Sequence, residues 1–323
     1  MEAFDVWEEV CPYLHLIVEA DEMRLALAMG DRRLSTWQVA DLLGVPHARA
    51  AEMLHRAYAR CTVDKVLEDG VSKYQSADFY ARLDHFVKYG AWHDIPEVDR
   101  KAINRRYLDE FIRRHEKAVR QVMSGLVPET HPPNDTVMLL EEVEEMIHAA
   151  SEIIVQPCDC RMLGENCDRP VETCIWLDEG ARQALDRGFG RRLTKAEAVQ
   201  LLRQADAKGL MHTSDAGWRE HGLSAICNCC ACDCYPFLAA QELGSKGVWP
   251  KSNYVASYDP GNCDQCGACV KRCHFEAFYH DGSMVEVDGK NRPGVALDVE
   301  KCWGCGLCAN TCPRGAIVMV PIA

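Results

Sequence analysis

Residues 302–313 read Cys-Trp-Gly-Cys-Gly-Leu-Cys-Ala-Asn-Thr-Cys-Pro, and this stretch decides the fold of the C-terminal part of the chain. Its cysteines follow the spacing C-x2-C-x2-C-x3-C, and residues 263–273 repeat that spacing. Three thiolates so closely spaced fold a short loop around one face of a cuboidal metal cluster, while the fourth is carried away to another cluster. Two such runs therefore predict a pair of interlocking metal sites.

The doubled motif, with Pro313 directly after the second run, resembles the bacterial two-cluster ferredoxins over about residues 257–320. The resemblance implies two [4Fe–4S] clusters with crossed ligation. One cluster would take Cys263, Cys266, Cys269 and Cys312. The other would take Cys302, Cys305, Cys308 and Cys273. Zinc is the alternative metal for such sets of thiolates, but zinc sites rarely use this doubled spacing.

Some neighbours of these cysteines fit the ferredoxin pattern and others depart from it. Three glycines suit a close approach of the backbone to a cluster, namely Gly267, Gly304 and Gly306. His274 stands where the family usually has proline, which predicts an altered environment for the last cysteine of the first run. Residues 275–301 exceed what a minimal ferredoxin needs, and Asp281-Gly282 predicts a hairpin there.

A second field of cysteines precedes the ferredoxin segment. It contains nine thiols: Cys158, Cys160, Cys167, Cys174, Cys227, Cys229, Cys230, Cys232 and Cys234. So dense a group would be oxidisable if left free, so we expect metal ligands. The pattern resembles a group of anaerobe iron–sulfur proteins with a ferredoxin-like tail, which implies one or two further clusters. One cubane with free or substrate-facing thiols, two cubanes and a larger non-cubane cluster all remain open. The adjacent Cys229 and Cys230 are expected to serve different metals, or only one of them is a ligand.

A folded unit is expected between the two groups of central cysteines. Thr194 to Glu197 form a capping box that predicts a helix reaching Gly209. Arg161 and Glu172 are candidates for groups that support the metal site or a substrate, but surface ion pairing is the preferred interpretation. His212 is interpreted as a structural histidine rather than a ligand.

The first 157 residues hold only two cysteines, Cys11 and Cys61, and their pattern predicts a mainly helical N-terminal module. Phe4, Trp7, Cys11, Leu14 and Val18 recur at spacings of three and four, which predicts one long first helix. The next helix is expected to end at Gly30.

A third helix is expected to open with the capping box at residues 35–38 and to stop at Gly44, and Pro46 suits the start of a fourth. Two strands joined by Asp69-Gly70 should follow, and then a long helix over about residues 96–123 and a loop over 125–135. This order resembles a winged helix-turn-helix over about residues 20–90.

A winged helix usually implies DNA, and the fourth helix offers His47, Arg49, His55, Arg56 and Arg60. Residues 1–125 nevertheless hold 18 Lys and Arg against 21 Asp and Glu, a balance of −3, where phosphate binding favours a positive excess. We therefore expect a protein-contact or dimerisation module, with a homodimer formed through it.

Composition limits the remaining classes of function. The net charge of −13 argues against nucleic acid as the principal partner and favours a protein partner with a cationic patch. The N-terminus lacks a secretory pattern and no run of 18 apolar residues occurs, so a cytoplasmic protein without membrane contact is expected. No haem-attachment, dinucleotide-binding or P-loop motif occurs.

The sequence thus predicts a multi-domain α+β protein. Its parts are a helical winged-helix-like module at residues 1–125, a cysteine-rich cluster-binding domain at 126–256 and a two-cluster ferredoxin domain at 257–323. The expected function is single-electron transfer to a partner redox enzyme or an internal cysteine-ligated site. One alternative is a reductase with the central cluster as active site, which an apolar pocket beside residues 227–234 would favour. Another is a redox-responsive transcription regulator, which a basic face at Arg49, Arg56 and Arg60 would favour.

Overall fold

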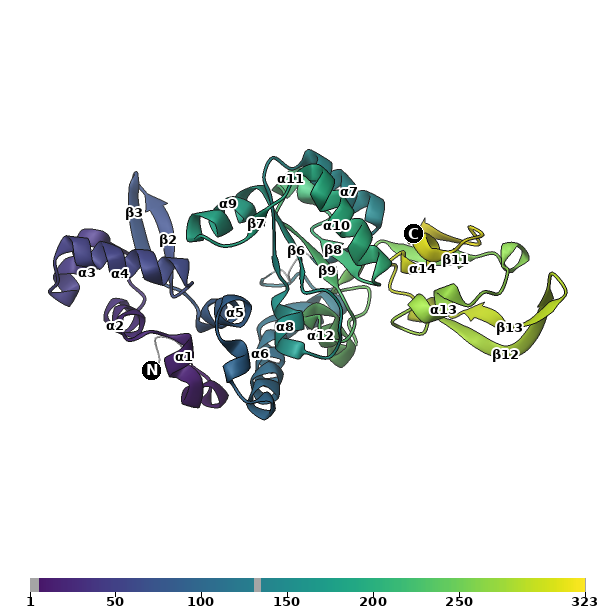
Figure 1. Ribbon diagram of the computed structural model, residues 1–323, viewed down its shortest axis with the longest axis horizontal. Coiled ribbons are helices and arrows are strands. Elements are labelled where there is room, and N and C mark those ends of the chain that lie inside the picture. The colour runs from purple at the N-terminus through teal and green to yellow at the C-terminus, as the bar shows by residue number, and fades with distance from the viewer. Residues whose placement is uncertain (1–5, 131–134, 323) are drawn as a thin grey trace. The chain divides into compact units, whose positions relative to one another are not determined.

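The computed structural model describes residues 6–130 and 135–322, and its chain divides into two compact units (Figure 1). Unit 1 comprises residues 1–109 with the short segments 162–164 and 183–189. Unit 2 comprises the rest, namely residues 110–161, 165–182 and 190–323. The boundary between the units falls inside a long helix, α6, rather than in a loop.

Unit 1 begins with short helical turns and continues into a helical domain with a small sheet. Its elements are η1 Glu8–Tyr13, α1 Leu14–Ile17, α2 Ala20–Met29, β1 Leu34–Ser35, α3 Thr36–Leu43, α4 His47–Ala59, β2 Val63–Glu68, β3 Val71–Ser76, α5 Phe79–Tyr89, η2 Trp92–Asp94 and the first half of α6 Glu97–Met123. The strands form an antiparallel sheet in the order β1-β3-β2.

The predicted helices of unit 1 are present from residue 20 onward. The capping box at Ser35 and Gln38 opens α3, and Gly44 ends it in the left-handed conformation. The expected hairpin is β2 and β3, joined at Asp69-Gly70. Leu25, Leu54 and Val63 belong to one buried core, so α2, α4 and the hairpin pack together.

The long first helix is not formed, and that expectation was wrong. Residues 8–13 form a 3-10 helix that contains Pro12, α1 covers only 14–17, and Val18 is extended. Proline removes a backbone donor and clashes with the preceding turn, so the apolar spacing could not be carried by one continuous α-helix. Trp7 is buried and meets Phe79, Tyr80 and Tyr107 edge to face. The predicted position Phe4 lies outside the described residues, as does part of the expected loop at 125–135.

Unit 2 is built on a seven-stranded sheet in the order β10-β4-β8-β9-β6-β5-β7 (Figure 1). The elements up to its last strand are β4 Thr136–Met138, α7 Leu140–Ala149, β5 Ile153–Pro157, α8 Asp159–Gly164, β6 Glu172–Leu177, α9 Asp178–Arg187, β7 Arg191–Arg192, α10 Lys195–Ala207, β8 Met211–Ser214, α11 Trp218–His221, β9 Ala225–Cys229, α12 Tyr235–Leu243 and β10 Lys251–Ser252. The C-terminal ends of α8 and α9 are counted in unit 1. All neighbouring strands are antiparallel except β10 and β4.

The two faces of this sheet are covered differently. Val143, Leu202 and Ile226 share one buried core, so α7 and α10 cover one face. Val137, Met211 and Phe237 share another, which places α12 against the opposite face. Because side chains alternate along a strand, neighbouring residues of β4 and β9 contribute to different faces.

The C-terminal segment of unit 2 has the twofold internal repetition that its sequence shows. Its elements are β11 Tyr254–Tyr258, η3 Pro260–Asn262, α13 Ala268–Arg272, β12 Phe278–Val287, β13 Lys290–Leu297, η4 Val299–Lys301, α14 Leu307–Thr311 and β14 Ile317–Pro321. The predicted hairpin is β12 and β13, but its two-residue turn is Asp288-Gly289. Asp281-Gly282 lies instead at an irregularity in the ladder between His280 and Met284.

Among the helices of the described residues, none combines the length and the apolar character needed to cross a membrane.

Candidate metal centres

Two small cavities in the C-terminal segment each gather cysteines from both motifs. The first is lined by Cys263, Cys266, Cys269 and Cys312. The second is lined by Cys273, Cys302, Cys305 and Cys308. Each cavity thus combines three cysteines of one run with the last cysteine of the other, which is the grouping that crossed ligation requires.

The residues around these cavities fit thiolate-ligated clusters. In the first run, the Gln265 amide donates to Cys263 Sγ at 3.3 Å and the Ala277 amide to Cys273 Sγ at 3.2 Å. The second run repeats both contacts, at 3.4 Å to Cys302 Sγ and 3.3 Å to Cys312 Sγ. Burial raises the pKa of Cys305 to about 12, so a bound cationic metal core would be what keeps such a thiolate charged. Donor type, number and hydrogen bonding therefore suit [4Fe–4S] clusters.

The glycines of the two runs take the left-handed conformation, with φ of 70° at Gly267, 69° at Gly304 and 77° at Gly306. At Gly304 a side chain would collide with the backbone of Tyr254, so that glycine is needed for packing against the start of β11.

His274, the departure from the ferredoxin pattern, connects the C-terminal segment to the seven-stranded domain. Its Nε2 lies 2.6 Å from the carbonyl oxygen of Gly209, so Nε2 carries the proton and donates it. Burial lowers the pKa of His274, which favours the neutral ring. Proline could not make this contact, because it has no side-chain donor.

Asp206, at the end of α10, strengthens the same junction. Arg272 donates to Asp206 Oδ2 at 3.2 Å, and Asn310 Nδ2 donates to Asp206 Oδ1 at 2.8 Å. Arg272 and Asn310 belong to α13 and α14, so one carboxylate holds the short helices of both runs. Sequence reasoning missed Asp206, since nothing in its local pattern marks it.

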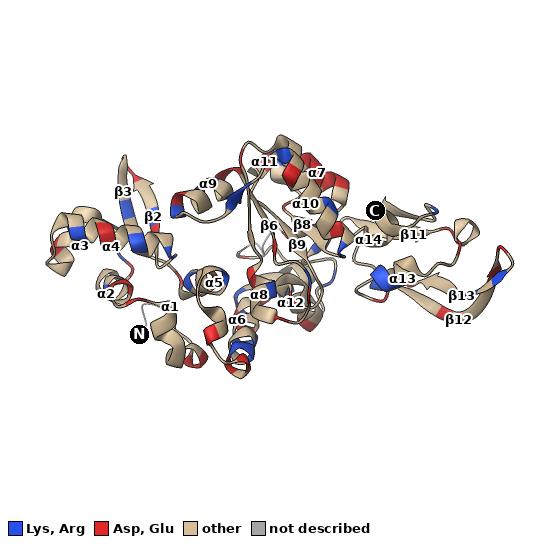
Figure 2. Ribbon diagram, in the orientation of Figure 1, with Lys and Arg blue, Asp and Glu red and all other residues tan. Residues whose placement is uncertain are grey.

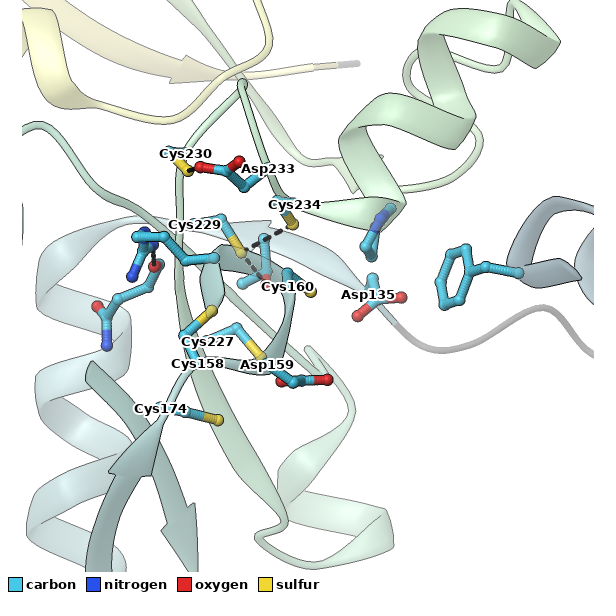
Figure 3. A pocket seen from close by; sticks show the side chains of 15 residues that line it. Asp135, Cys158, Asp159, Cys160, Cys174, Cys227, Cys229, Cys230, Asp233 and Cys234 are labelled. Carbon is cyan, nitrogen blue, oxygen red and sulfur yellow. Dashed lines mark hydrogen bonds between the residues drawn. The ribbon is translucent and has the colours of Figure 1, made fainter. Parts of the chain in front are cut away.

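A third and larger cavity, of about 200 Å3, lies in unit 2 beside the sheet (Figure 3). The cysteines that line it are Cys158, Cys160, Cys174, Cys227, Cys229, Cys230 and Cys234. Cys227 and Cys229 lie two residues apart on β9, so they reach the same face. Cys158 and Cys234 are the residues directly before α8 and α12. Two strands and two helix starts, distant in sequence, thus converge on one site.

Six of these thiols form a chain of neighbours. Cys234 donates a hydrogen bond to Cys229 at 3.2 Å. The pKa of Cys160 responds to Cys158 and Cys234, the pKa of Cys229 responds to Cys227, and the pKa of Cys227 responds to Cys174.

Two members of this chain are poised as thiolates. Hydrogen bonds from Cys158 and Cys234 lower the pKa of Cys160 to about 5, helped by the backbone amide of Tyr235. Bonds from Cys227 and Cys234 lower the pKa of Cys229 to about 6. The pKa values of Cys158 and Cys234 lie well above the ordinary value, since these thiols donate the bonds. Protons and negative charge are thus shared among the sulfurs of the cavity. Such a set of sulfur donors suits soft metals.

Arg161 is buried beside this cavity, so the preferred interpretation as a surface ion pair was wrong. It is 3 % exposed and donates to the carbonyl oxygens of Pro170 and Asn228, at 2.6 and 2.7 Å. Burial opposes its charge, but the thiols of Cys158 and Cys230 outweigh burial and raise the pKa of Arg161. A fixed positive charge beside thiolates stabilises them.

Glu172 and His212 lie as their interpretations as a surface ion-pairing residue and a structural histidine require. Glu172 is exposed and forms an ion pair with Arg191 at 3.4 Å. His212 is buried, its Nδ1 lies 2.7 Å from Asn228 Oδ1, and it does not line the cavity.

Cys167, Cys230 and Cys232 form a separate group with Asp233. The four donor atoms all lie within 4.8 Å of one another. Cys230 and Asp233 also line the edge of the third cavity, whereas Cys167 and Cys232 do not. Figure 3 shows the sulfur of Cys230 next to the carboxylate of Asp233, away from Cys227 and Cys174. Asp233 was not predicted from the sequence, although it lies between two of the quoted cysteines.

Comparison with known proteins places the C-terminal segment in a defined class. A family model described as a 4Fe-4S dicluster domain matches residues 262–316. The chain therefore carries a two-cluster ferredoxin domain at its C-terminal end, and that prediction is confirmed.

Three curated relatives are similar to parts of the chain. An uncharacterised ferredoxin of Methanocaldococcus jannaschii is 35% identical over 83 residues, which covers 18% of this chain and 50% of that protein. Pyruvate synthase subunit PorD of Thermotoga maritima is 28% identical over 93 residues, which covers 25% of this chain and 85% of that protein. Indolepyruvate oxidoreductase subunit IorA of Pyrococcus horikoshii is 26% identical over 129 residues, which covers 40% of this chain and 18% of that protein. The chain thus spans half of the first relative and under a fifth of the last. No solved structure matches it significantly.

Proposed function

We propose that this protein transfers single electrons between an external redox partner and a metal centre in its own third cavity. Bound [4Fe–4S] clusters supply the one-electron chemistry. Two of the relatives are by name subunits, one of an indolepyruvate oxidoreductase and one of a pyruvate synthase, which supports a protein partner for this chain.

The observation that carries the proposal is an apolar bridge between the ferredoxin segment and the third cavity. Phe275 and Trp303 line the second ferredoxin cavity and stack at 4.6 Å between ring centroids. Trp303 also meets Phe237 of α12 at 5.3 Å. Trp303 and Phe237 share one buried core with Cys229 and Cys234. The two cysteine sites are therefore separated by packed side chains rather than by solvent.

The six linked thiols would hold at least one further cluster. A cubane needs four thiolates, so two of the six would remain for protonation, a second metal or a bound molecule. The buried Arg161 would offset part of the negative charge of that centre.

The test counts clusters on the full chain, purified without oxygen. We expect about eight iron and eight sulfide from the ferredoxin segment, and about four more of each from the third cavity. The double variant Cys160→Ser with Cys229→Ser should remove only the latter, leaving the ferredoxin EPR signals after reduction. Sulfide limited to eight in both proteins would reject a central cluster, whereas EPR without cluster signals would reject electron transfer itself.

A reductase is the second candidate, because the third cavity has room beside its thiols. It is about 200 Å3 and is lined by Phe111 and Pro236 as well as by cysteines. Asp135 also lines it, and burial raises its pKa to about 6, which would suit a proton donor. Perturbation of the central EPR signal by a small exogenous ligand such as cyanide would support this candidate. An unchanged signal would favour pure electron transfer.

The basic helix of unit 1 weighs against a regulator that binds DNA. Arg49 pairs with Asp21 and Glu52, and Arg56 pairs with Glu52 at 3.6 Å. Arg60 pairs with Glu22 at 2.6 Å. Figure 2 shows acidic residues beside the basic ones of α4. We therefore propose that the winged-helix-like unit contacts protein, including a second copy of itself.

A further inference from the structure

The group formed by Cys167, Cys230, Cys232 and Asp233 has its own ligand geometry. Cys167 and Cys232 lie on different loops, one before β6 and one after β9. Cys230 and Asp233 are each only 1 % exposed. Cys167 and Cys232 are half-buried. Three thiols and a carboxylate gathered at so shielded a place are costly unless a cation compensates them.

The distances within the group match one metal ion rather than a cluster. A tetrahedral ion with metal–sulfur bonds of about 2.3 Å places its sulfurs about 3.8 Å apart, and an oxygen ligand at about 2.0 Å lies about 3.5 Å from each sulfur. Cys167 Sγ and Cys230 Sγ are 3.8 Å apart. Asp233 Oδ2 lies 3.1 Å from Cys167 Sγ and 3.4 Å from Cys230 Sγ.

The carboxylate of Asp233 is oriented for such a role. Its Oδ1 accepts hydrogen bonds from the backbone amide and the side-chain amide of Asn166, at 3.1 and 3.0 Å. Its Oδ2 is left facing the sulfurs. Arg169 Nη1, 3.7 Å from Cys232 Sγ, adds a positive charge beside the site. Ligands held by such outer hydrogen bonds are typical of built metal sites.

The ferredoxin cysteines provide an internal comparison. Within the described residues, none of those eight belongs to a group of three or more donors within 4.8 Å of one another. Cubane ligands attach to irons at separate corners and so need wider spacing. The compactness of the Cys167 group is therefore a property of that group and not of every cysteine cluster in the protein.

We propose that Cys167, Cys230, Cys232 and Asp233 bind a single tetrahedral zinc ion, without sulfide, apart from the cluster of the third cavity. The ion ties the loop at 166–169 to the turn at 230–233. That turn directly joins Cys229 to Cys234, so the ion fixes two thiols of the neighbouring cavity. The adjacent Cys229 and Cys230 then serve different metals.

Zinc-edge X-ray absorption on the anaerobic full chain tests the coordination without any variant. We expect three sulfurs at about 2.3 Å and one oxygen at about 2.0 Å around about one zinc per chain. Four sulfurs, or no zinc, would overturn the proposal. This readout does not depend on iron, so its failure is distinct from failure of the proposed electron transfer.

Variants then connect the zinc to these residues. Asp233→Asn should lose most of the zinc while its iron and sulfide stay unchanged, which also shows that the chain is folded. The matched control is Asp168→Asn, the same substitution on an exposed carboxylate next to Cys167, which should keep the zinc. Loss of about four iron and four sulfide together in Asp233→Asn would instead assign Asp233 to a cluster and refute the zinc site.

Discussion

Cys312 belongs to the second ferredoxin run, yet it lines the cavity of the first run's cysteines. Replacing Cys312 by Ser should therefore damage the same cluster as replacing Cys266 by Ser. Both variants should lose about four of eight ferredoxin irons and keep one surviving cluster with the same EPR signal and reduction potential. The control is Cys308→Ser, from the same run as Cys312, which should leave the opposite cluster. Ligation within each run would be indicated if Cys312→Ser and Cys308→Ser left the same survivor.

His85 is expected to make unit 1 sensitive to acid. Burial lowers its pKa to about 3, with the positive charge of Arg82 as a further cause, and Arg82 Nη1 lies 3.2 Å from His85 Nδ1. The folded state thus binds a proton less readily than the unfolded chain, so the stability that neutral His85 gives is complete above about pH 6.5 and is lost as pH falls toward 3. Allowing for partial exposure, the free energy of unfolding should fall by about 1.5 kcal/mol between pH 7 and pH 4.

Chemical denaturation at several pH values, followed by tryptophan fluorescence, measures this dependence. His85→Gln keeps an acceptor for Arg82 but cannot take up a proton in this range, so its stability should change less over the same range. Exposed His93 offers a control, since His93→Gln should retain the wild-type slope. Equal slopes in wild type and His85→Gln would exclude His85 as the source.

At the level of single residues, the sequence predicted the positions of the candidate cysteine ligands better than it predicted the side chains that contact them or hold the site together. Cysteine spacing, together with the resemblance to two-cluster ferredoxins, assigned the eight ferredoxin cysteines to two sets, and the cavities contain those sets. Arg161, Asp206 and Asp233 could not be found in this way. Their roles depend on burial and on partners that approach from distant segments, which no local pattern records.

Among the elements, helices with capping residues were predicted well and the central sheet was not. The capping boxes at Ser35 and Thr194 mark helices that the structure contains. The strands of the seven-stranded sheet are two to six residues long, and β9 carries cysteines where a typical strand has branched apolar residues. The cysteines of β9 therefore concealed its strand signal.

The end of α10 should control how firmly the ferredoxin segment docks. Asp206 accepts from Arg272 and Asn310, and Arg272 is only 19% exposed in its side chain. Asp206→Ala leaves a half-buried arginine without its carboxylate, so docking should weaken by about 2 to 3 kcal/mol. Hydrogen exchange should then speed up in α13, α14 and the 206–210 turn, while the core of α10 stays protected.

A substitution on the exposed side of the same helix separates docking from general helix stability. Arg203 pairs with Glu144 at 2.7 Å and is 64% exposed. Surface pairs contribute little, so Arg203→Gln should change exchange in α13 and α14 by no more than experimental error. Comparable acceleration in both variants would mean that α10 itself had loosened and that Asp206 has no special part in docking.

The charge of the whole molecule is spread unevenly along its sequence. Residues 126–256 hold 20 Asp and Glu against 12 Lys and Arg, a balance of −8. Residues 257–323 hold 8 against 6, a balance of −2. Figure 2 shows acidic residues concentrated along α7. Docking that depends on negative charge would therefore use the seven-stranded domain more than the ferredoxin segment.

Because of this charge distribution, we expect the full chain to bind duplex DNA only weakly and without sequence preference. Arg49, Arg56 and Arg60 are already paired with carboxylates of unit 1, and none of the three parts 1–125, 126–256 and 257–323 carries a positive excess. Dissociation constants for duplex DNA at physiological salt should therefore be weaker than about 1 µM. The double variant Asp21→Asn with Glu52→Gln frees Arg49 and removes one of the two acidic partners of Arg56, so it should bind measurably better and with a steeper salt dependence. Mobility shifts compare the two proteins, and a sequence-specific shift of the wild type below that concentration would show that unit 1 reads DNA after all.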